Sequence, residues 1–300
     1  AAVHAVQQGW QLGTIAPRMQ DLPPLLVAAE RVAATVSQGV HGRRRVGQGE
    51  TFWQFRRYQP GDSAQAIDWR QSAKSQPVYV RENEWEAAES VWLWRDESPS
   101  MLYRSRKPTP RKAECAALLL LALASLLVKG GERVALLGSG RAPASGHAFL
   151  SRLATAVEEA LEPEEGRKAS ASLPAFELLP RHARVVLIGD FLPPLEEVEA
   201  AVAAFSGLGA RGHLMQVLDP AEETLPFSGR VRFRGMENEG DVLIPRVESL
   251  RGDYQNAVAR HHDGLAAVAR AAGWSFAAHR TDRPPEMALL ALYMALSEPF

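Results

Sequence analysis

Short apolar runs alternate along most of this chain with longer stretches in which apolar residues recur at helical spacing. The short runs after residue 89 are VWLW (91–94), RVALL (133–137), RVVLIGD (184–190), HLMQVLD (213–219) and WSFAAH (274–279). The helical stretches cover about 111–129, 146–161, 195–206, 252–272 and 285–297. Because strands alternate with helices and are apolar on both faces, the pattern predicts an α/β fold, a mainly parallel sheet with helices on both faces and right-handed crossovers.

The N-terminal part of the chain has a different pattern. Residues 22–37 place apolar residues at helical spacing and predict a short helix. Glycines and a Pro-Gly pair then surround Thr51–Tyr58 and Pro77–Arg81, which are rich in aromatic and β-branched residues and predict a β-hairpin. We therefore expect two domains, a helix and basic β-rich module at 1–88 and an α/β domain at 89–300.

A smaller pattern interrupts the second domain. The sequence MENEG is flanked by two strand-like segments, VRFR (231–234) and DVLI (241–244). A short polar turn between two such segments is typical of a hairpin. We therefore expect an inserted hairpin near 230–245.

The composition is that of an ordinary globular chain, with 46% apolar and 23% charged residues among 300. The single cysteine, Cys115, excludes an internal disulfide framework and a multi-cysteine metal site, and we expect it to serve in packing. The longest uncharged apolar stretch, 115–128, is shorter than the roughly 18 to 20 residues that a membrane span needs. We expect a cytoplasmic protein without a transmembrane segment, peripheral to a membrane only through partners.

Charge is unevenly distributed along the chain. The 34 basic and 35 acidic residues nearly cancel, but residues 41–81 contain eight basic and three acidic residues, a local charge of +5. Either these arginines pair with acidic groups of the larger domain, or the module binds a polyanion such as nucleic acid. We favour internal pairing, because the net charge of the whole chain is only −1.

Candidate ligands of a cation follow two of the expected strands. In an open parallel sheet, ligands bind where the carboxyl ends of the strands meet. Asp96-x-Ser98-x-Ser100 follows the first strand with a carboxylate and two hydroxyls, and Asp190 follows a later strand. Oxygen atoms of these kinds suit Mg²⁺. In the alternative interpretation, both serines cap the following turn and Asp190 is an ordinary loop residue.

These residues resemble a known family. Asp96-x-Ser98-x-Ser100 with Asp190 is similar to the metal-ion-dependent adhesion site of von Willebrand factor A domains. The signature that precedes such a domain in the bacterial domain-of-unknown-function family 58 resembles three upstream segments, GQGETF (47–52), RYQPGD (57–62) and IDWR (67–70). The resemblance covers about residues 40–200. It implies a von Willebrand factor A-like, Rossmann-like fold for the second domain and partnership with a MoxR-type AAA+ ATPase.

The resemblance also implies a metal site, with Mg²⁺ as the cofactor and Mn²⁺ or Ca²⁺ as alternatives. Its ligands would be Asp96, Ser98, Ser100 and Asp190. The second loop of such a site normally supplies a threonine; here Ser170 and Ser172 are the nearest hydroxyls, while Thr155 falls in an expected helix. Arg95 replaces the usual apolar residue and could pair with Asp96 or Glu97. Because of these departures, the alternative of a degenerate site, which has kept the fold but lost the metal ion, stays open.

The upstream motif allows a structural and a functional interpretation. Pro60-Gly61-Asp62 is a turn sequence, and the charged residues around it could lock the hairpin to the main sheet by salt bridges. Alternatively, its aromatic residues beside arginines form a contact surface for a partner, because these residue types are enriched in binding hot spots. We favour the structural interpretation. The residues concerned are Arg56, Arg57, Tyr58, Asp62, Asp68, Trp69 and Arg70.

We therefore expect a non-enzymatic, metal-dependent adaptor that works with a MoxR-type AAA+ ATPase in assembly or maturation of a client. An Asp or Glu of the partner would complete the metal's coordination. One alternative is a Mg²⁺-dependent phosphoryl-transfer enzyme with Asp96 as nucleophile; against it, residue 98 is serine and no lysine is obviously placed to neutralise a phosphate. The other alternative is nucleic-acid binding through residues 41–81, which the near-neutral total charge does not favour.

One polar cluster stands apart from these candidates. His261-His262-Asp263 falls within the helix expected at 252–272. Adjacent residues of a helix point to different faces, so the three side chains do not converge on one ligand. We expect a solvated surface at this cluster.

Overall fold

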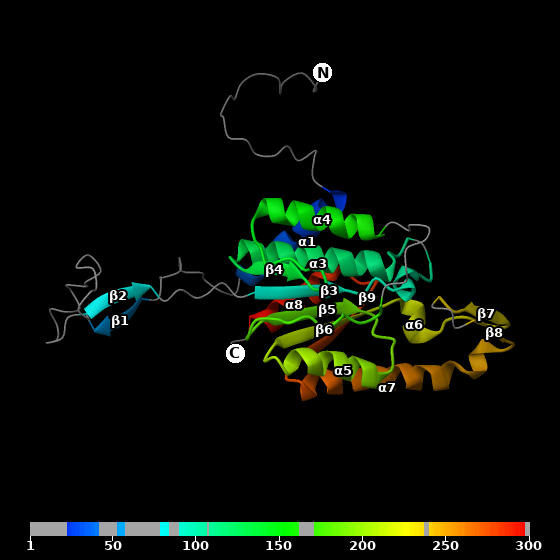
Figure 1. Cartoon of the computed structure of the whole chain (residues 1–300). Coiled ribbons are helices and arrows are strands. Elements are labelled where there is room, and N and C mark those ends of the chain that lie inside the picture. The colour runs from blue at the N-terminus through cyan, green and yellow to red at the C-terminus, as the bar shows by residue number, and fades with distance from the viewer. Residues whose placement is uncertain are drawn as a thin grey trace, which may run out of the picture.

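The computed structural model describes residues 23–41, 53–57, 79–83, 90–106, 108–161, 171–236 and 240–297 (Figure 1). Its centre is a sheet of five parallel strands, β3 (Ser90–Arg95), β4 (Arg133–Leu136), β5 (Arg184–Gly189), β6 (Arg211–Leu218) and β9 (Ser275–Arg280). Strand β5 is buried at every position, as expected for an apolar strand covered on both faces. The expected α/β class with a mainly parallel sheet is confirmed.

The order of the strands creates a natural place for a ligand. Across the sheet they run β4-β3-β5-β6-β9. The chain leaves β3 to form β4 on one side and then returns to form β5 on the other side of β3. At this topological switch point the loops that follow β3 and β5 diverge and leave room between them. The residues directly after these two strands are Asp96 and Asp190.

Helices lie on both sides of the sheet (Figure 1). One side holds α1 (Pro24–His41), α3 (Lys112–Lys129), α4 (His147–Leu161) and α8 (Pro285–Leu296), and the other holds α5 (Leu195–Ser206) and α7 (Arg251–Ala271). Helix α3 contacts the sheet as well as α1, α4 and α8, which explains why it is apolar on all faces. None of the helices in the described ranges is long and apolar enough to cross a membrane.

The N-terminal helix contributes to the core of the α/β domain. Helix α1 packs against α3 and α8, and its buried Leu26, Ala29 and Ala33 belong to the same apolar cluster as α3. Strands β1 (Trp53–Arg57) and β2 (Tyr79–Asn83) pair antiparallel, as hairpin-like β structure requires. The helix expected at 22–37 therefore packs with the larger domain, while the boundary at residue 88 stays a prediction.

Short elements surround the carboxyl ends of the strands. The loop after β3 forms η2 (Pro99–Leu102), and β6 leads into α6 (Pro220–Thr224). The hairpin expected near 230–245 is formed by β7 (Val231–Arg234) and β8 (Asp241–Ile244), and η3 (Val247–Ser249) then leads into α7. Figure 1 places α6 and the β7–β8 hairpin beyond the carboxyl ends of the sheet, so these elements flank the switch point.

Candidate functional site

The loop after β3 is organised by the carboxylate of Asp96. Asp96 Oδ1 accepts a hydrogen bond from the backbone N–H of Ser98 at 2.8 Å, and the Asp96 N–H donates to the Ile188 carbonyl of β5 at 2.8 Å. The hydroxyl oxygens of Ser98 and Ser100 lie 3.0 Å apart, within hydrogen-bond distance. The short side chains of this loop therefore turn inward, and Asp96, Ser98 and Ser100 are all buried.

Asp190 joins this group from the end of β5. The hydroxyl of Ser100 donates to Asp190 Oδ2 at 2.6 Å. The structure thus brings together Asp96, Ser98, Ser100 and Asp190, the four residues that the sequence placed at one edge of the sheet. Their role as metal ligands stays a prediction.

A buried lysine lies beside these four residues. Lys112 is the first residue of α3, and its side chain is 0% exposed. Its Nζ donates to Asp190 Oδ2 at 2.9 Å and to Glu222 Oε1 of α6 at 2.5 Å. No lysine was obvious at this place from the sequence, and the structure brings one there, paired with two carboxylates. One signal was present in the sequence, because a cation in the first turn of a helix opposes the helix dipole and calls for a compensating partner.

The electrostatics keep Lys112 charged. Burial alone would lower the pKa of Lys112, but the carboxylates of Asp190 and Glu222 raise it above its ordinary value. Burial raises the pKa of Glu222, and the nearby Asp190 adds to this rise, while Lys112 lowers it. A buried ammonium between two carboxylates is stabilised by both, so we assign Lys112 as protonated and paired at neutral pH.

The end of β6 adds another carboxylate. Asp219 caps α6: its Oδ1 accepts from the Ala221 N–H at 2.8 Å, and its Oδ2 accepts from the Ser105 N–H at 2.9 Å. Glu222 completes this capping box by accepting from the Asp219 N–H at 2.9 Å. The ends of β3, β5 and β6 therefore contribute the carboxylates of Asp96, Asp190 and Asp219 to one region, and Lys112 contacts Asp190 there as well as Glu222 of α6.

Polar contacts from α7 and β6 hold the Asp190 loop. Phe191 has a φ of 52°, an unusual backbone conformation for a bulky residue. His261 Nε2 lies 2.7 Å from the Phe191 carbonyl oxygen, and Gln216 Nε2 donates to the Asp190 carbonyl at 3.2 Å. His262 Nδ1 lies 3.2 Å from Gln216 Oε1. The expected solvated surface at these histidines is therefore wrong, because both rings are partly buried and support the loop.

A glycine permits the close approach of β3 and β5 at this point. A Cβ atom on Gly189 would lie 2.8 Å from Asp96 Cβ and 3.2 Å from Asp96 Oδ2. Carbon atoms do not approach that closely without a shift of the neighbouring group. Gly189 is therefore the residue that lets the Asp96 carboxylate sit against the end of β5.

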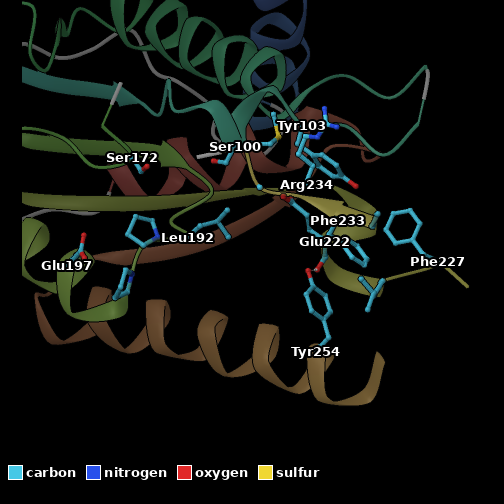
Figure 2. Close-up of a pocket in the computed structure, with 16 residues that line it drawn as sticks. Ser100, Tyr103, Ser172, Leu192, Glu197, Glu222, Phe227, Phe233, Arg234 and Tyr254 are labelled. Carbon is cyan, nitrogen blue, oxygen red and sulfur yellow. Dashed lines mark hydrogen bonds between the residues drawn. The ribbon is translucent and has the colours of Figure 1, made fainter. Parts of the chain in front are cut away.

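A cavity of about 580 Å³ opens above the charged residues. Ser100 and Glu222 reach it from the buried cluster, and most of its remaining lining is apolar or aromatic. Figure 2 shows Leu192 and Glu197 on one side of the cavity and Phe227, Phe233 and Tyr254 on the other, with the Tyr254 side chain reaching Glu222. The Tyr254 hydroxyl donates to the Glu222 carbonyl oxygen at 2.6 Å. The site therefore combines a polar floor with apolar walls.

The remaining candidate residues are distributed as follows. Ser172 lines the same cavity as Ser100, whereas Ser170 lies outside the described residues. Thr155 lies in α4, where its hydroxyl donates to the Ser151 carbonyl at 3.1 Å. Arg95 pairs with Glu97 at 2.7 Å. Arg56 and Arg57 lie in β1, where the structure describes only the backbone. The candidate residues that lie outside the described ranges are Tyr58, Asp62, Asp68, Trp69 and Arg70.

The residues at the switch point do not fit a divalent cation in this arrangement. A Mg²⁺ ion bound to Asp190 Oδ2 would lie about 2.1 Å from that oxygen. The same oxygen already accepts from Ser100 Oγ and Lys112 Nζ, so the ion would meet the ammonium at close range and be repelled. In the part of the chain that the structure describes, no group of three or more His, Cys, Asp or Glu side chains could hold a metal ion.

Comparison with known proteins identifies a family without a known function. The family model described as "Protein of unknown function DUF58" matches residues 54–264. Three uncharacterised proteins, one of Mycobacterium bovis and two of Mycobacterium tuberculosis, are each 29% identical over 283 residues, which is 88% of this chain and 87% of theirs. The relatives therefore span most of the chain but carry no described activity.

Two solved structures resemble the chain more distantly. An aerotolerance-related membrane protein of Bacteroides fragilis is 17% identical with a TM-score of 0.43, and the match covers 70% of this chain and 98% of that one. BatB of Bacteroides thetaiotaomicron, a conserved hypothetical protein, is 14% identical with a TM-score of 0.38, over 71% of this chain and 100% of that one.

Proposed function

Because this chain belongs to the DUF58 family, whose function is unknown, we propose from its geometry that it is a non-enzymatic adaptor whose partner docks in the cavity at the carboxyl end of the sheet. The partner we propose is a MoxR-type AAA+ ATPase, as the resemblance of the sequence implies. The likeness to von Willebrand factor A domains belongs to the same proposal, and it rests on the Asp96-x-Ser98-x-Ser100 loop with Asp190.

The lining of the cavity is the observation that carries this proposal. Leu192 is 53% exposed and Met236 is 41% exposed, and both line the cavity together with Phe227 and Phe233. Apolar and aromatic side chains around a concave surface are the usual anchors of protein recognition. A cavity of this character is suited to bind side chains of a partner segment.

The charge at the floor of the cavity narrows the chemistry of that segment. Glu197 and Glu222 line the cavity, and the carboxylates of Asp190 and Asp219 lie beneath it. Two cations oppose them: Lys112 contacts Asp190 and Glu222, and Arg234 lines the cavity and pairs with Asp241. The four carboxylates outnumber these two cations, so a cationic group is attracted. We therefore propose that the docked segment is apolar and carries a Lys or Arg, in place of the metal-bridged Asp or Glu of the sequence-based expectation.

The internal hydrogen bonds of the cluster favour docking over phosphoryl transfer. A nucleophilic Asp96 would have to face the substrate, but Asp96 is 0% exposed and is not part of the cavity lining, and its Oδ1 accepts from the Ser98 N–H inside its own loop. Lys112, which could neutralise a phosphate, is held by two carboxylates. Each group that the reaction requires is thus engaged in an intramolecular contact.

The proposal is tested by measuring binding of the purified chain to a MoxR-type AAA+ ATPase from the same organism. We expect Leu192→Gln and Met236→Gln each to weaken binding at least about tenfold, the effect of losing a well-placed apolar anchor. The matched control is Met287→Gln, because Met287 is 72% exposed but lies on α8, outside this cavity. Equal binding by all three variants would contradict docking at the cavity, and no binding by the wild type would contradict the choice of partner.

A further inference from the structure

We propose that the Lys112 ammonium permanently occupies the place in which an adhesion site holds its divalent cation, so that this site works without metal and accepts a cation only when Lys112 is removed. This inference concerns the chain alone. It holds or fails independently of the identity of any docking partner.

Lys112 contacts one of the expected ligands, Asp190, which hydrogen bonds link to two others, Ser100 and Ser98. Its Nζ lies 2.9 Å from Asp190 Oδ2, and that oxygen also accepts from Ser100 Oγ at 2.6 Å. Ser100 Oγ in turn lies 3.0 Å from Ser98 Oγ. One continuous chain of contacts therefore joins the hydroxyls of the first loop, the carboxylate of the later loop and the ammonium.

Burial explains why a cation is needed at this point. The Asp190 side chain is 0% exposed, and a buried carboxylate is costly unless a positive charge or several hydrogen bonds compensate it. Lys112 reaches Asp190 from another segment, 78 residues away along the chain, and it continues to Glu222. The chain itself thus supplies the compensation that a bound ion would otherwise give.

Removal of the ammonium would leave a set of groups with metal-binding chemistry. The remaining oxygen atoms belong to the carboxylates of Asp190 and Glu222 and the hydroxyls of Ser98 and Ser100, all hard donors that suit Mg²⁺ and Mn²⁺. The space of the lysine side chain would be free at the same point. We therefore expect a variant without Lys112 to bind a divalent cation.

A simpler interpretation is that Lys112 only fastens α3 to β5 and α6 through its two ion pairs. Under that interpretation, removal of the lysine destabilises the fold and a divalent cation restores nothing. Rescue by a cation therefore separates the two interpretations, whereas loss of stability by itself does not.

The experiment measures Mn²⁺ binding by electron paramagnetic resonance and thermal unfolding by circular dichroism, with and without Mn²⁺. The proteins are the wild type, Lys112→Ala, the double variant Lys112→Ala with Asp190→Asn, and the control Lys129→Ala. Lys129 is a matched control because it is an exposed lysine at the other end of the same helix.

We expect the wild type and Lys129→Ala to show no saturable Mn²⁺ binding. Lys112→Ala should bind Mn²⁺ at least about a hundredfold more tightly than the wild type, because a nearby positive charge no longer repels the ion. The double variant should lose this gain. If Lys112→Ala is unfolded in chelator, we expect Mn²⁺ to restore its folded circular dichroism signal.

Two results would overturn the inference. Saturable Mn²⁺ binding by the wild type that Asp190→Asn abolishes would mean that the ammonium does not hold the place of the ion. Failure of Mn²⁺ to bind or rescue Lys112→Ala would mean that Lys112 is only a structural ion pair. Neither result depends on whether an ATPase binds the chain, so this inference and the proposed function fail separately.

Discussion

The two ends of the central sheet bury polar groups in different ways. At the amino end, His213 Nδ1 lies 2.7 Å from Ser275 Oγ, and Trp274 Nε1 donates to the Ala210 carbonyl at 3.1 Å. Burial lowers the pKa of His213 to about 4, so this imidazole is neutral at neutral pH. At the carboxyl end the buried groups are charged, because Lys112 lies between carboxylates. The amino end thus buries a neutral imidazole near Arg184, which is 6% exposed, whereas the carboxyl end buries an ammonium between two carboxylates.

The two ends also differ in the size of the cavity that each contains. A Cβ atom on Gly212 would lie 2.5 Å from the Trp274 ring, so the two residues pack directly, and the pocket beside them is small, about 130 Å³. The carboxyl end opens into the cavity beside Leu192 and Met236. Neutral buried groups need only hydrogen-bond partners, whereas buried ions also need charge balance. The charge balance of the carboxyl end therefore depends on Lys112, which contacts two carboxylates.

The largest expected effect comes from removing that lysine. Lys112→Met keeps most of the side-chain volume and leaves Asp190 and Glu222 without their shared ammonium. We expect the free energy of unfolding in chelator to fall by about 3 to 5 kcal/mol, the usual cost of removing one partner of a buried ion pair. Urea denaturation measures it, with Lys129→Met as the control. A loss below about 1 kcal/mol would show that the carboxyl end does not depend on this charge.

We expect protonation of His213, at the amino end of the sheet, to lower the free energy of unfolding in acid. The folded pKa of His213 is about 4 and its unfolded pKa is about 6.5, so the unfolded chain binds more protons between these values. Stability should therefore fall as pH falls from about 6.5 to about 4, by up to about 3 kcal/mol from this residue. His213→Gln should remove that part of the slope in urea denaturation.

A second histidine, His279, contributes to the same pH dependence of stability. Burial also lowers the pKa of His279, against the opposing effect of Asp282 and Glu286, so some slope of the same sign should remain in His213→Gln. The difference between wild type and variant isolates His213. Identical slopes in the two proteins would mean that the imidazole is not buried in its neutral form.

A smaller effect tests the packing of the amino end. Gly212→Ala forces the buried Trp274 ring to move, and we expect a loss of about 1 to 3 kcal/mol, as for other overpacked cores. Gly252→Ala is the matched control, because nothing lies within 4 Å of its Cβ position in the first turn of α7. Urea denaturation of both variants gives the difference. A harmless Gly212→Ala would mean that this end is less tightly packed than the ring contact indicates.

The arrangement of elements could be predicted because its signals are local. The spacing of neighbouring apolar residues predicts each strand and helix, and the alternation of strands with helices predicts a parallel sheet. The meeting of Asp96 and Asp190 also follows, because the carboxyl ends of parallel strands share one edge. The role of these residues as metal ligands stays a prediction, because it depends on which cation lies at this edge.

Contacts between distant segments could not be predicted in the same way. Lys112 contacts Asp190 and Glu222, which are 78 and 110 residues away along the chain. In the sequence it is only a charged residue at the start of an apolar helix. His261 similarly reaches the Phe191 carbonyl across 70 residues. The spacing within a helix shows which face a residue occupies, but the partner on that face depends on how the layers pack. Those partners define the candidate site.

The smallest expected change in stability belongs to the wall of the cavity. Leu192 is more than half exposed, so Leu192→Gln gives up little buried apolar surface, and we expect the free energy of unfolding to change by no more than about 0.5 kcal/mol. Its binding to the ATPase should nevertheless weaken, because a docked partner would bury the same surface. Urea denaturation and binding measured on one preparation separate the two effects. If Leu192→Gln lost both stability and binding, the Leu192 side chain would stabilise the Asp190 loop and would not belong to a docking surface.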